Sequence, residues 1–145
     1  MLNFEKLNFE NVAGVALLEK ECFGKYAWSQ QLLIEEINQE NKHYIVVKKD
    51  NTVIAYGGFS QVLDEAHIMN IAVKSGYRKQ GIAYKLLQKL IDLAKEKNIS
   101  SMTLEVRESN IPARNLYEKH AFKLAGVRKG YYQDKENACI YWKAL

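Results

Sequence analysis

The residues best suited to chemistry form a short basic loop, Lys74 to Ala83, which contains two glycines. The loop lies between an apolar, strand-like run and a long amphipathic segment with helical spacing. The first N–H groups of a helix have no partner within it, and the helix dipole favours negative charge at that end. Gly81 lets a phosphate approach the backbone, while Arg78 and Lys79 add positive charge. The segment therefore predicts a pyrophosphate site.

The loop alone leaves a second interpretation open, because helices that bind nothing also begin with glycine and basic residues. Its spacing is not that of a P-loop, and it lacks the Gly-x-Gly-x-x-Gly turn of dinucleotide-binding folds. Two other candidates are equally ambiguous on pattern alone. Glu105 could be a solvated strand carboxylate or one paired with arginine, and Tyr117 could be a core residue of a short helix.

Hydrophobic periodicity predicts the elements that must position these residues. Ser29 and Asn110 are expected N-caps. Expected helices cover 9–23, 29–39, 82–94 and 110–117, and expected strands cover 4–7, 43–49, 53–62, 66–73, 101–107, 122–132 and 138–142. In strand 101–107, Thr103, Glu105 and Arg107 share one face. The order βααβββαβαββ predicts an α/β fold with a mixed sheet and helices on its faces.

Composition limits the possible classes of protein. A chain of 145 residues with 48% hydrophobic content predicts one domain, residues 1–145. The net charge of +4 is too small to indicate nucleic-acid binding. Two separated cysteines and three scattered histidines suggest neither a disulfide framework nor a metal site. There is no apolar run of about 18 to 20 residues and no signal-peptide pattern, so we expect a reduced, cytoplasmic protein without a membrane partner.

The segment Arg78 to Ala83 matches the Arg/Gln-x-x-Gly-x-Gly/Ala signature of the GCN5-related N-acetyltransferases (GNAT). The strand that precedes this segment also fits, so the chain resembles that family. Asn110, Leu116 and Tyr117 also fit, and the resemblance covers essentially the whole chain. More narrowly, Asn-Ile-Ala-Val, Leu-Glu-Val-Arg and Leu-Tyr-Glu are similar to the RimI type, which acetylates the N-terminal alanine of small-subunit ribosomal protein 18. The resemblance implies a GNAT fold, a mostly antiparallel sheet of about seven strands with about four helices.

The same resemblance implies acetyl-coenzyme A as co-substrate, no metal, and a set of binding residues. A backbone N–H near Ile71 or Ala72 should face the thioester carbonyl, and the Asn110 side chain should contact the pantetheine arm. The arm should pair with the strand Ile71, Ala72 and Val73. The pyrophosphate should lie on the loop residues Arg78, Lys79, Gln80, Gly81, Ile82, Ala83 and Tyr84.

Acetyl transfer also needs a base for the amine and a proton donor for the thiolate. The resemblance makes Glu105 the candidate base, acting directly or through water, and Tyr117 the candidate acid. The expected acceptor groove contains Tyr26, Trp28, Tyr131 and Tyr132, although the last two could equally be ordinary strand aromatics. Gln133 and Asn137 depart from the RimI pattern in this region, which leaves the acceptor open.

We therefore expect an acetyl-coenzyme A-dependent N-acetyltransferase that acts on a protein N-terminus by direct attack in a ternary complex. The expected partner is a peptide or protein acceptor, with a ribosomal protein as one candidate, and the protein is expected to be a monomer or weak dimer. Two alternatives stay open. One is acetylation of a small-molecule amine such as a polyamine or amino sugar. The other is a non-catalytic coenzyme A-binding module.

Overall fold

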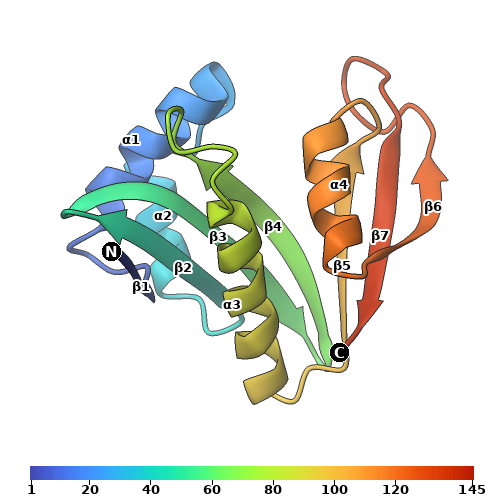
Figure 1. The fold of residues 1–145 in the computed structure, drawn as a ribbon, viewed down its shortest axis with the longest axis horizontal. Coiled ribbons are helices and arrows are strands. Elements are labelled where there is room, and N and C mark those ends of the chain that lie inside the picture. The colour runs from blue at the N-terminus through green and yellow to red at the C-terminus, as the bar shows by residue number, and fades with distance from the viewer.

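The computed structural model describes residues 1–145 and contains seven strands, four α-helices and one 3₁₀ turn. Their order is the predicted βααβββαβαββ, and Figure 1 shows their arrangement. The helices are α1 Val12–Phe23, α2 Gln30–Ile37, α3 Ile82–Glu96 and α4 Ile111–Lys119, with the 3₁₀ turn at Gly24–Tyr26. The strands are β1 Leu2–Lys6, β2 Lys42–Lys49, β3 Thr52–Val62, β4 Glu65–Val73, β5 Ser101–Arg107, β6 Lys123–Arg128 and β7 Ala138–Ala144.

All seven strands belong to one sheet with the order β1-β2-β3-β4-β5-β7-β6. Every neighbouring pair is antiparallel except β4 and β5, which are parallel. The predicted fold class, a mixed and mostly antiparallel sheet flanked by helices, is confirmed. None of the helices combines the length and the apolar character that crossing a membrane requires.

Helices cover the two faces of the sheet unequally. The main core lies under α3 and α4 and includes Leu86, Leu90 and Tyr117, together with the inward-facing residues of β5. A smaller cluster lies under α1 and α2, over strands β2 to β4. No helix packs on this second face beyond β4. The side chains of β5, β7 and β6 on that face are therefore left for loops and ligands to cover.

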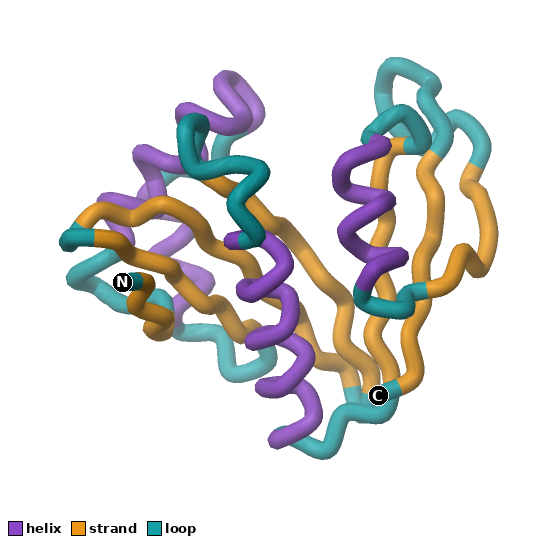
Figure 2. The backbone as a smooth tube through the Cα atoms, viewed as in Figure 1, coloured by secondary structure: helices purple, strands orange, loops and turns teal.

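The sheet divides between β4 and β5 (Figures 1 and 2). Only three residue pairs join these strands, from Glu65 opposite Ser101 to His67 opposite Thr103. Beyond them the two strands diverge, and the backbone edges that would pair in a continuous sheet are free. The loop that leads into α3 lies at the open end of this gap (Figure 1).

A β-bulge determines which backbone groups of β4 face the gap. The register with β3 moves from Ile68 opposite Phe59 to Asn70 opposite Gly58, so Met69 is the extra residue. Beyond the bulge, the Lys74 N–H donates to the Ile54 carbonyl at 2.7 Å. In an antiparallel pair, the backbone N–H and C=O groups of successive residues point alternately toward the partner strand and away from it. The backbone groups of Ala72 therefore also face β3, whereas those of Ile71 and Val73 point into the gap. Of the two residues expected to present an N–H there, Ile71 is the one so placed.

The sequence also predicted several local features correctly. The Ser29 hydroxyl accepts the Leu32 N–H at 3.1 Å, and the Asn110 side chain accepts the Ala113 N–H, so both are N-caps. Asp50 and Asn51 have φ values of 51° and 65° and join β2 to β3. This positive-φ pair is the geometry of a two-residue hairpin turn.

The strand expected over 122–132 is wrong at its C-terminal end. Strand β6 stops at Arg128, opposite Ala138, and the nine residues between them form a loop. Gly130 has a φ of +63°, and its N–H donates to the Asn137 side chain at 3.0 Å instead of continuing the ladder. Tyr131 and Tyr132 are thus loop residues and not strand aromatics.

Candidate functional site

The start of α3 presents a series of unsatisfied donors. From Arg78 to Tyr84 no backbone N–H donates to another group of the protein, and the first bond of the helix runs from Lys85 to the Gly81 carbonyl. Lys79 and Gly81 have φ values of +63° and +80°. Backbone that alternates between left- and right-handed conformations makes a concave nest of N–H groups suited to an anion. A Cβ built on Gly81 would contact nothing within 4 Å, so the space before the backbone is open.

The basic side chains of this loop contribute less free charge than the sequence indicated. Lys74 forms an ion pair with Glu21 of α1 at 3.1 Å. The Arg78 side chain folds back, donating from Nε to the Val73 carbonyl at 2.9 Å and approaching the Cys22 sulfur at 3.6 Å. Lys79 is exposed and forms no ion pair or side-chain hydrogen bond. The positive character of the site therefore comes chiefly from the backbone, with Lys79 as its free cation.

Tyr84 links the two halves of the molecule on the α3 and α4 side. Its ring stacks on His120 with centroids 3.9 Å apart, and its carbonyl lies 3.0 Å from His120 Nε2. Burial lowers the pKa of His120, so the ring is neutral at neutral pH and Nε2 can donate to the carbonyl. This contact holds the first turn of α3 against the end of α4. It does not occupy the Tyr84 N–H, which stays available.

Asn110 uses only half of its side chain within the protein. The Oδ1 atom caps α4 through Ala113, whereas no protein acceptor binds the Nδ2 group. The amide therefore has two free donors at the end of β5 that faces the mouth of the gap. This agrees with the expected contact to a bound ligand, which stays a prediction.

Tyr117 has a buried ring and an accessible hydroxyl. The side chain is 8% exposed and packs edge-on against Phe122 with centroids 5.8 Å apart. Its hydroxyl forms no hydrogen bond, yet no buried polar atom in the protein lacks a partner, so this oxygen must reach open space. Burial, with a smaller effect of Tyr132, raises the pKa of Tyr117 to about 12. The group is therefore a phenol held in its protonated form.

Glu105 lies on the other face of β5, among polar side chains. The Tyr131 hydroxyl donates to its Oε2 at 3.2 Å, and His67 Nε2 lies 3.8 Å from the same oxygen. Arg128 is 4.0 Å from Oε1. The carboxylate is 21% exposed, so it is accessible without being freely solvated. Because its strand neighbours Leu104 and Val106 pack into the core with Tyr117, Glu105 and Tyr117 approach β5 from opposite faces.

His67 and Arg128 were not predicted as site residues. Neither stands in a recognisable motif, and His67 is 38 positions from Glu105 in the chain. Alternation in the strand 66–73 could have placed His67 on the face away from the core. Only the pairing of β4 with β5 brings it beside Glu105. At 44% exposure, the imidazole connects the carboxylate with solvent.

Trp28 and Tyr26 come from the connection between α1 and α2. The backbone N–H of Trp28 donates to the Glu19 carboxylate at 2.8 Å. Glu19 is only 1% exposed and also accepts a hydrogen bond from the Tyr56 hydroxyl. The indole packs edge-on against Tyr44, with centroids 6.5 Å apart. Trp28 is thereby fixed over strands β2 to β4. Tyr26 is 72% exposed, and Lys25 lies over its ring at 5.2 Å from the centroid. No contact joins either residue to Glu105 or to the tyrosines of the β6–β7 loop.

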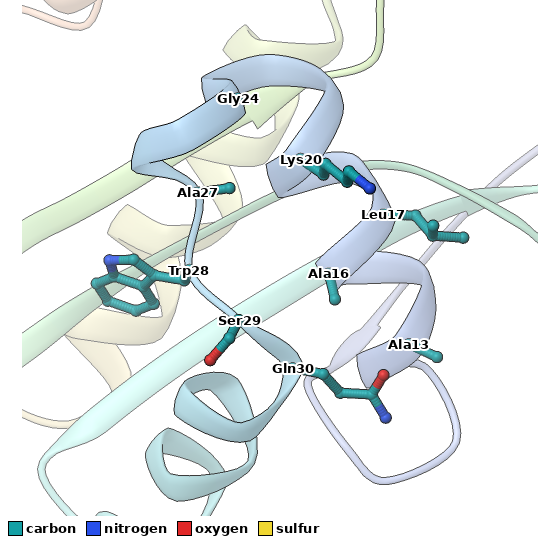
Figure 3. A pocket seen from close by; sticks show the side chains of 9 residues that line it. All are labelled: Ala13, Ala16, Leu17, Lys20, Gly24, Ala27, Trp28, Ser29 and Gln30. Atoms are coloured by element: carbon teal, nitrogen blue, oxygen red, sulfur yellow. The ribbon is translucent and has the colours of Figure 1, made fainter.

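The connection between α1 and α2 also borders a shallow pocket on the outer side of α1 (Figure 3). The Trp28 indole points away from the α1 side chains of this pocket (Figure 3). The residues that line the pocket are Ala13, Ala16, Leu17, Lys20, Gly24, Ala27, Trp28, Ser29 and Gln30. No other predicted site residue lines it, so this pocket is separate from the gap between β4 and β5.

Comparisons with known proteins identify the family and the fold. The profile of the acetyltransferase (GNAT) family matches residues 12–122. A candidate ribosomal protein bS18-alanine N-acetyltransferase of Bacillus subtilis is 36% identical over 141 residues, covering 96% of this chain and 93% of that protein. The ribosomal protein bS18-alanine N-acetyltransferase of Haemophilus influenzae is 40% identical over 109 residues, covering 71% and 74%. The crystal structure of the corresponding Escherichia coli enzyme superposes with a TM-score of 0.90 at 29% identity, covering 100% of this chain and 94% of that one.

Proposed function

Because the chain belongs to the acetyltransferase (GNAT) family and is an N-acetyltransferase, we propose that its acceptor is the N-terminal α-amino group of a protein, with ribosomal protein bS18 as the first candidate. The acceptors named for the relatives from Haemophilus influenzae and Escherichia coli support this assignment. The observation that carries it in this chain is the arrangement of Glu105 and Tyr117 on opposite faces of β5, beside the point where β4 and β5 separate.

Members of this family use acetyl-coenzyme A, and the residues present here fit it. Seven consecutive free N–H groups, with open space before Gly81, suit a pyrophosphate. The backbone groups of Ile71 and the Val73 N–H face the gap and suit an extended amide-containing arm, which can pair with β4 as a further strand. The Val73 carbonyl already accepts from Arg78. Asn110 Nδ2 offers another donor on the opposite side of the gap. When bound, acetyl-coenzyme A supplies an activated acetyl group as a thioester.

The roles of the chain's own groups follow from where they lie. Glu105 accepts a proton from the incoming ammonium group, and half-exposed His67, 3.8 Å away, gives that proton a route to solvent. The Ile71 N–H points into the gap, where it can donate to the oxygen that becomes negative during attack. Tyr117 approaches from the α4 side and donates a hydrogen bond to the departing sulfur, which leaves as a thiolate and takes its proton from solvent.

An α-amino acceptor suits this base better than a lysine side chain. A free α-amino group has a pKa of about 7.7 to 8.0, whereas a lysine is near 10.4. At neutral pH the α-amine needs only a small bias toward its neutral form. A carboxylate with an imidazole beside it can supply that bias, while lysine deprotonation would need about 3.5 kcal/mol more.

Direct attack on the thioester is supported by the state of the two cysteines. Cys139 is 1% exposed within the main core, where no substrate reaches it. Burial raises the pKa of the Cys22 thiol, and its hydrogen-bond partners are the Val73 carbonyl and Arg78, with no carboxylate or imidazole bonded to it. Neither thiol is placed to carry an acetyl group.

The acceptor class is testable with a panel of amines. We expect a peptide that carries the N-terminus of bS18 to be acetylated at its α-amine, at a kcat/KM at least about 100-fold above that of spermidine or an amino sugar. The same peptide with a blocked α-amine and a free lysine is the control. Mass spectrometry locates the modification. A preference for spermidine would identify a small-molecule enzyme, and coenzyme binding without turnover on any amine would identify a binding module.

Gly81 gives a separate test of the pyrophosphate site. We expect Gly81→Ala to raise the Kd for acetyl-coenzyme A by about tenfold, because the new methyl group enters the open space before the nest of N–H groups. The left-handed backbone also costs a non-glycine residue about 1 kcal/mol of stability.

The matched control for Gly81→Ala is Gly76→Ala. Gly76 also has a positive φ, 93°, and open surroundings, but it precedes the series of free N–H groups. Calorimetry with coenzyme A and thermal unfolding separate the two effects. Equal losses of affinity in both variants would remove the pyrophosphate from this helix terminus.

A further inference from the structure

The loop between β6 and β7 has few backbone bonds to hold it in place. From Lys129 to Asn137 it leaves the sheet entirely and closes on itself through Tyr132 N–H to Glu136 and Lys135 N–H to Tyr132. One backbone bond, from the Glu108 N–H to the Asn137 carbonyl at 3.1 Å, joins it to the chain after β5. None of its side chains is buried in the core. Side-chain contacts must set its position.

Arg107 supplies more of these contacts than any other residue. Its Nη1 donates to both carboxylate oxygens of Asp134, at 3.0 and 2.8 Å, and to Glu136 at 2.9 Å. The guanidinium also lies over the Tyr132 ring, 4.1 Å from its centroid. The second oxygen of Glu136 accepts the Ser109 N–H at 2.9 Å, which ties the loop to the end of β5 a second time. We call this set of contacts the Arg107 clasp.

The clasp places the two loop tyrosines at the site. Arg107 lies two residues after Glu105 on the same face of β5. The loop segment that it fastens carries Tyr131 onto the Glu105 carboxylate at 3.2 Å. Tyr132 lies close enough to Tyr117 to contribute to its raised pKa. Arg107 thus fastens the segment that carries both tyrosines, and Arg128 adds a contact 5.6 Å from the centroid of the Tyr131 ring.

Exposure sets how strong the clasp can be. An isolated surface ion pair contributes little to stability and is screened by salt. Here one guanidinium serves two carboxylates and a ring, a geometry that the point charge of lysine cannot reproduce. The clasp is therefore specific in geometry but easily weakened, because Arg107 is 42% exposed and Asp134 is 61% exposed.

We propose that Arg107 is a positioning residue that holds the β6–β7 loop against Glu105, so that the loop forms one wall of the acceptor site. This proposal rests on the proposed function. Arg107 itself touches neither the amine nor the thioester. Its effect passes through Tyr131 and falls mainly on the acceptor. Acetyl-coenzyme A binding, which uses β4, the start of α3 and Asn110, changes little, because Asn110 is held by its own cap bond to Ala113.

The kinetic test compares Arg107→Gln and Arg107→Lys with Lys129→Gln. Lys129 is an exposed cation of the same loop without an ion pair, so its removal changes the charge equally. We expect both Arg107 variants to raise the KM for the peptide acceptor by about tenfold, with the KM for acetyl-coenzyme A changed by less than about twofold. Lys129→Gln should behave as the wild type. A rise in both KM values, or the same rise in Lys129→Gln, would overturn the proposal.

A double-mutant cycle tests whether the effect passes through Tyr131. If it does, Tyr131→Phe should cost much less in the Arg107→Gln background than in the wild type, because the phenol has already left Glu105. Additive losses would show that the two residues act independently and would refute the positioning role.

Hydrogen exchange separates failure of this inference from failure of the proposed function, because it needs no acceptor. The Tyr132 and Lys135 amides, which close the loop, should exchange at least about tenfold faster in Arg107→Gln than in Lys129→Gln. Unchanged protection means that Arg107 does not hold the loop, whatever the enzyme acetylates. Loss of protection in an enzyme that leaves protein N-termini unmodified would contradict the function and leave the clasp standing.

Discussion

Replacing Tyr117 by Phe should lower kcat by about 100-fold while leaving the affinity for acetyl-coenzyme A and the thermal stability almost unchanged. The reason is the division of this side chain into two parts. The ring fills the core under α4 and is retained in Phe, whereas the hydroxyl forms no hydrogen bond within the protein. Removing the hydroxyl therefore changes the stability of the fold little, but it leaves the departing thiolate without its hydrogen-bond donor.

The raised pKa gives this prediction a pH signature. With a folded-state pKa of about 12, above the usual value of 10, the phenol keeps its proton throughout the range in which an amine acetyltransferase is assayed. An alkaline decline of kcat near pH 9 or 10 therefore cannot come from Tyr117. A free thiol has a pKa of about 8.5, so Tyr117 acts by hydrogen bonding to the developing charge, and full proton transfer to sulfur is uphill.

Steady-state kinetics at saturating acetyl-coenzyme A, with calorimetry of coenzyme binding, measure these effects. Tyr141→Phe is the informative contrast, because the Tyr141 hydroxyl donates to Glu118 at 2.6 Å and accepts from Arg114 at 3.1 Å. That variant should lose stability with kcat nearly intact. Full turnover in Tyr117→Phe would remove its hydroxyl from the mechanism.

Replacing Glu105 by Gln should lower kcat/KM for the peptide by about 100-fold at pH 7. Glutamine keeps the size of the side chain and can still contact Tyr131, but it cannot take a proton from the ammonium group. The defect should shrink as the pH rises past about 8, because the α-amine then loses its proton to water without help.

A pH profile of kcat/KM from 6 to 10 for wild type and variant tests the role of Glu105. Glu65→Gln is the matched control, since Glu65 is an exposed strand carboxylate without a partner at the joined end of the gap. A defect of constant size at every pH would assign Glu105 to acceptor binding instead of proton transfer. Activity equal to the wild type would exclude both roles.

Features set by local rules could be predicted from the sequence. Ser29 and Asn110 cap helices because a side-chain oxygen near free N–H groups needs no information from elsewhere in the chain. The strand positions of Glu105 and Arg107 follow from simple alternation, and the free N–H groups before α3 follow from the glycine-containing helix start. The motif Arg78 to Ala83 lies in one of these locally determined elements. This explains why the family and the fold could be predicted from the sequence.

The rest depends on contacts between distant segments. His67 meets Glu105 only because β4 and β5 pair for three residues. Tyr131 meets it only because β6 ends at Arg128 and the chain then turns away at Gly130. Tyr131 and Tyr132 are residues typical of strands, so their types could not reveal that the strand ends before them. Lys74 and Arg78 bind inside the protein for the same kind of reason, since their partners Glu21 and Val73 are fixed by tertiary packing.

A substrate that binds in the gap between β4 and β5 can form main-chain hydrogen bonds that a continuous sheet would form within the protein. Three residue pairs leave main-chain donors and acceptors on both edges that a continuous sheet would satisfy internally. Any molecule that pairs there acts thermodynamically as an eighth strand, and a ligand at 100 times its Kd adds about 2.7 kcal/mol to the free energy of unfolding. The supply of acetyl donor thus sets not only the rate of this enzyme but also how much of it stays folded and resistant to proteases.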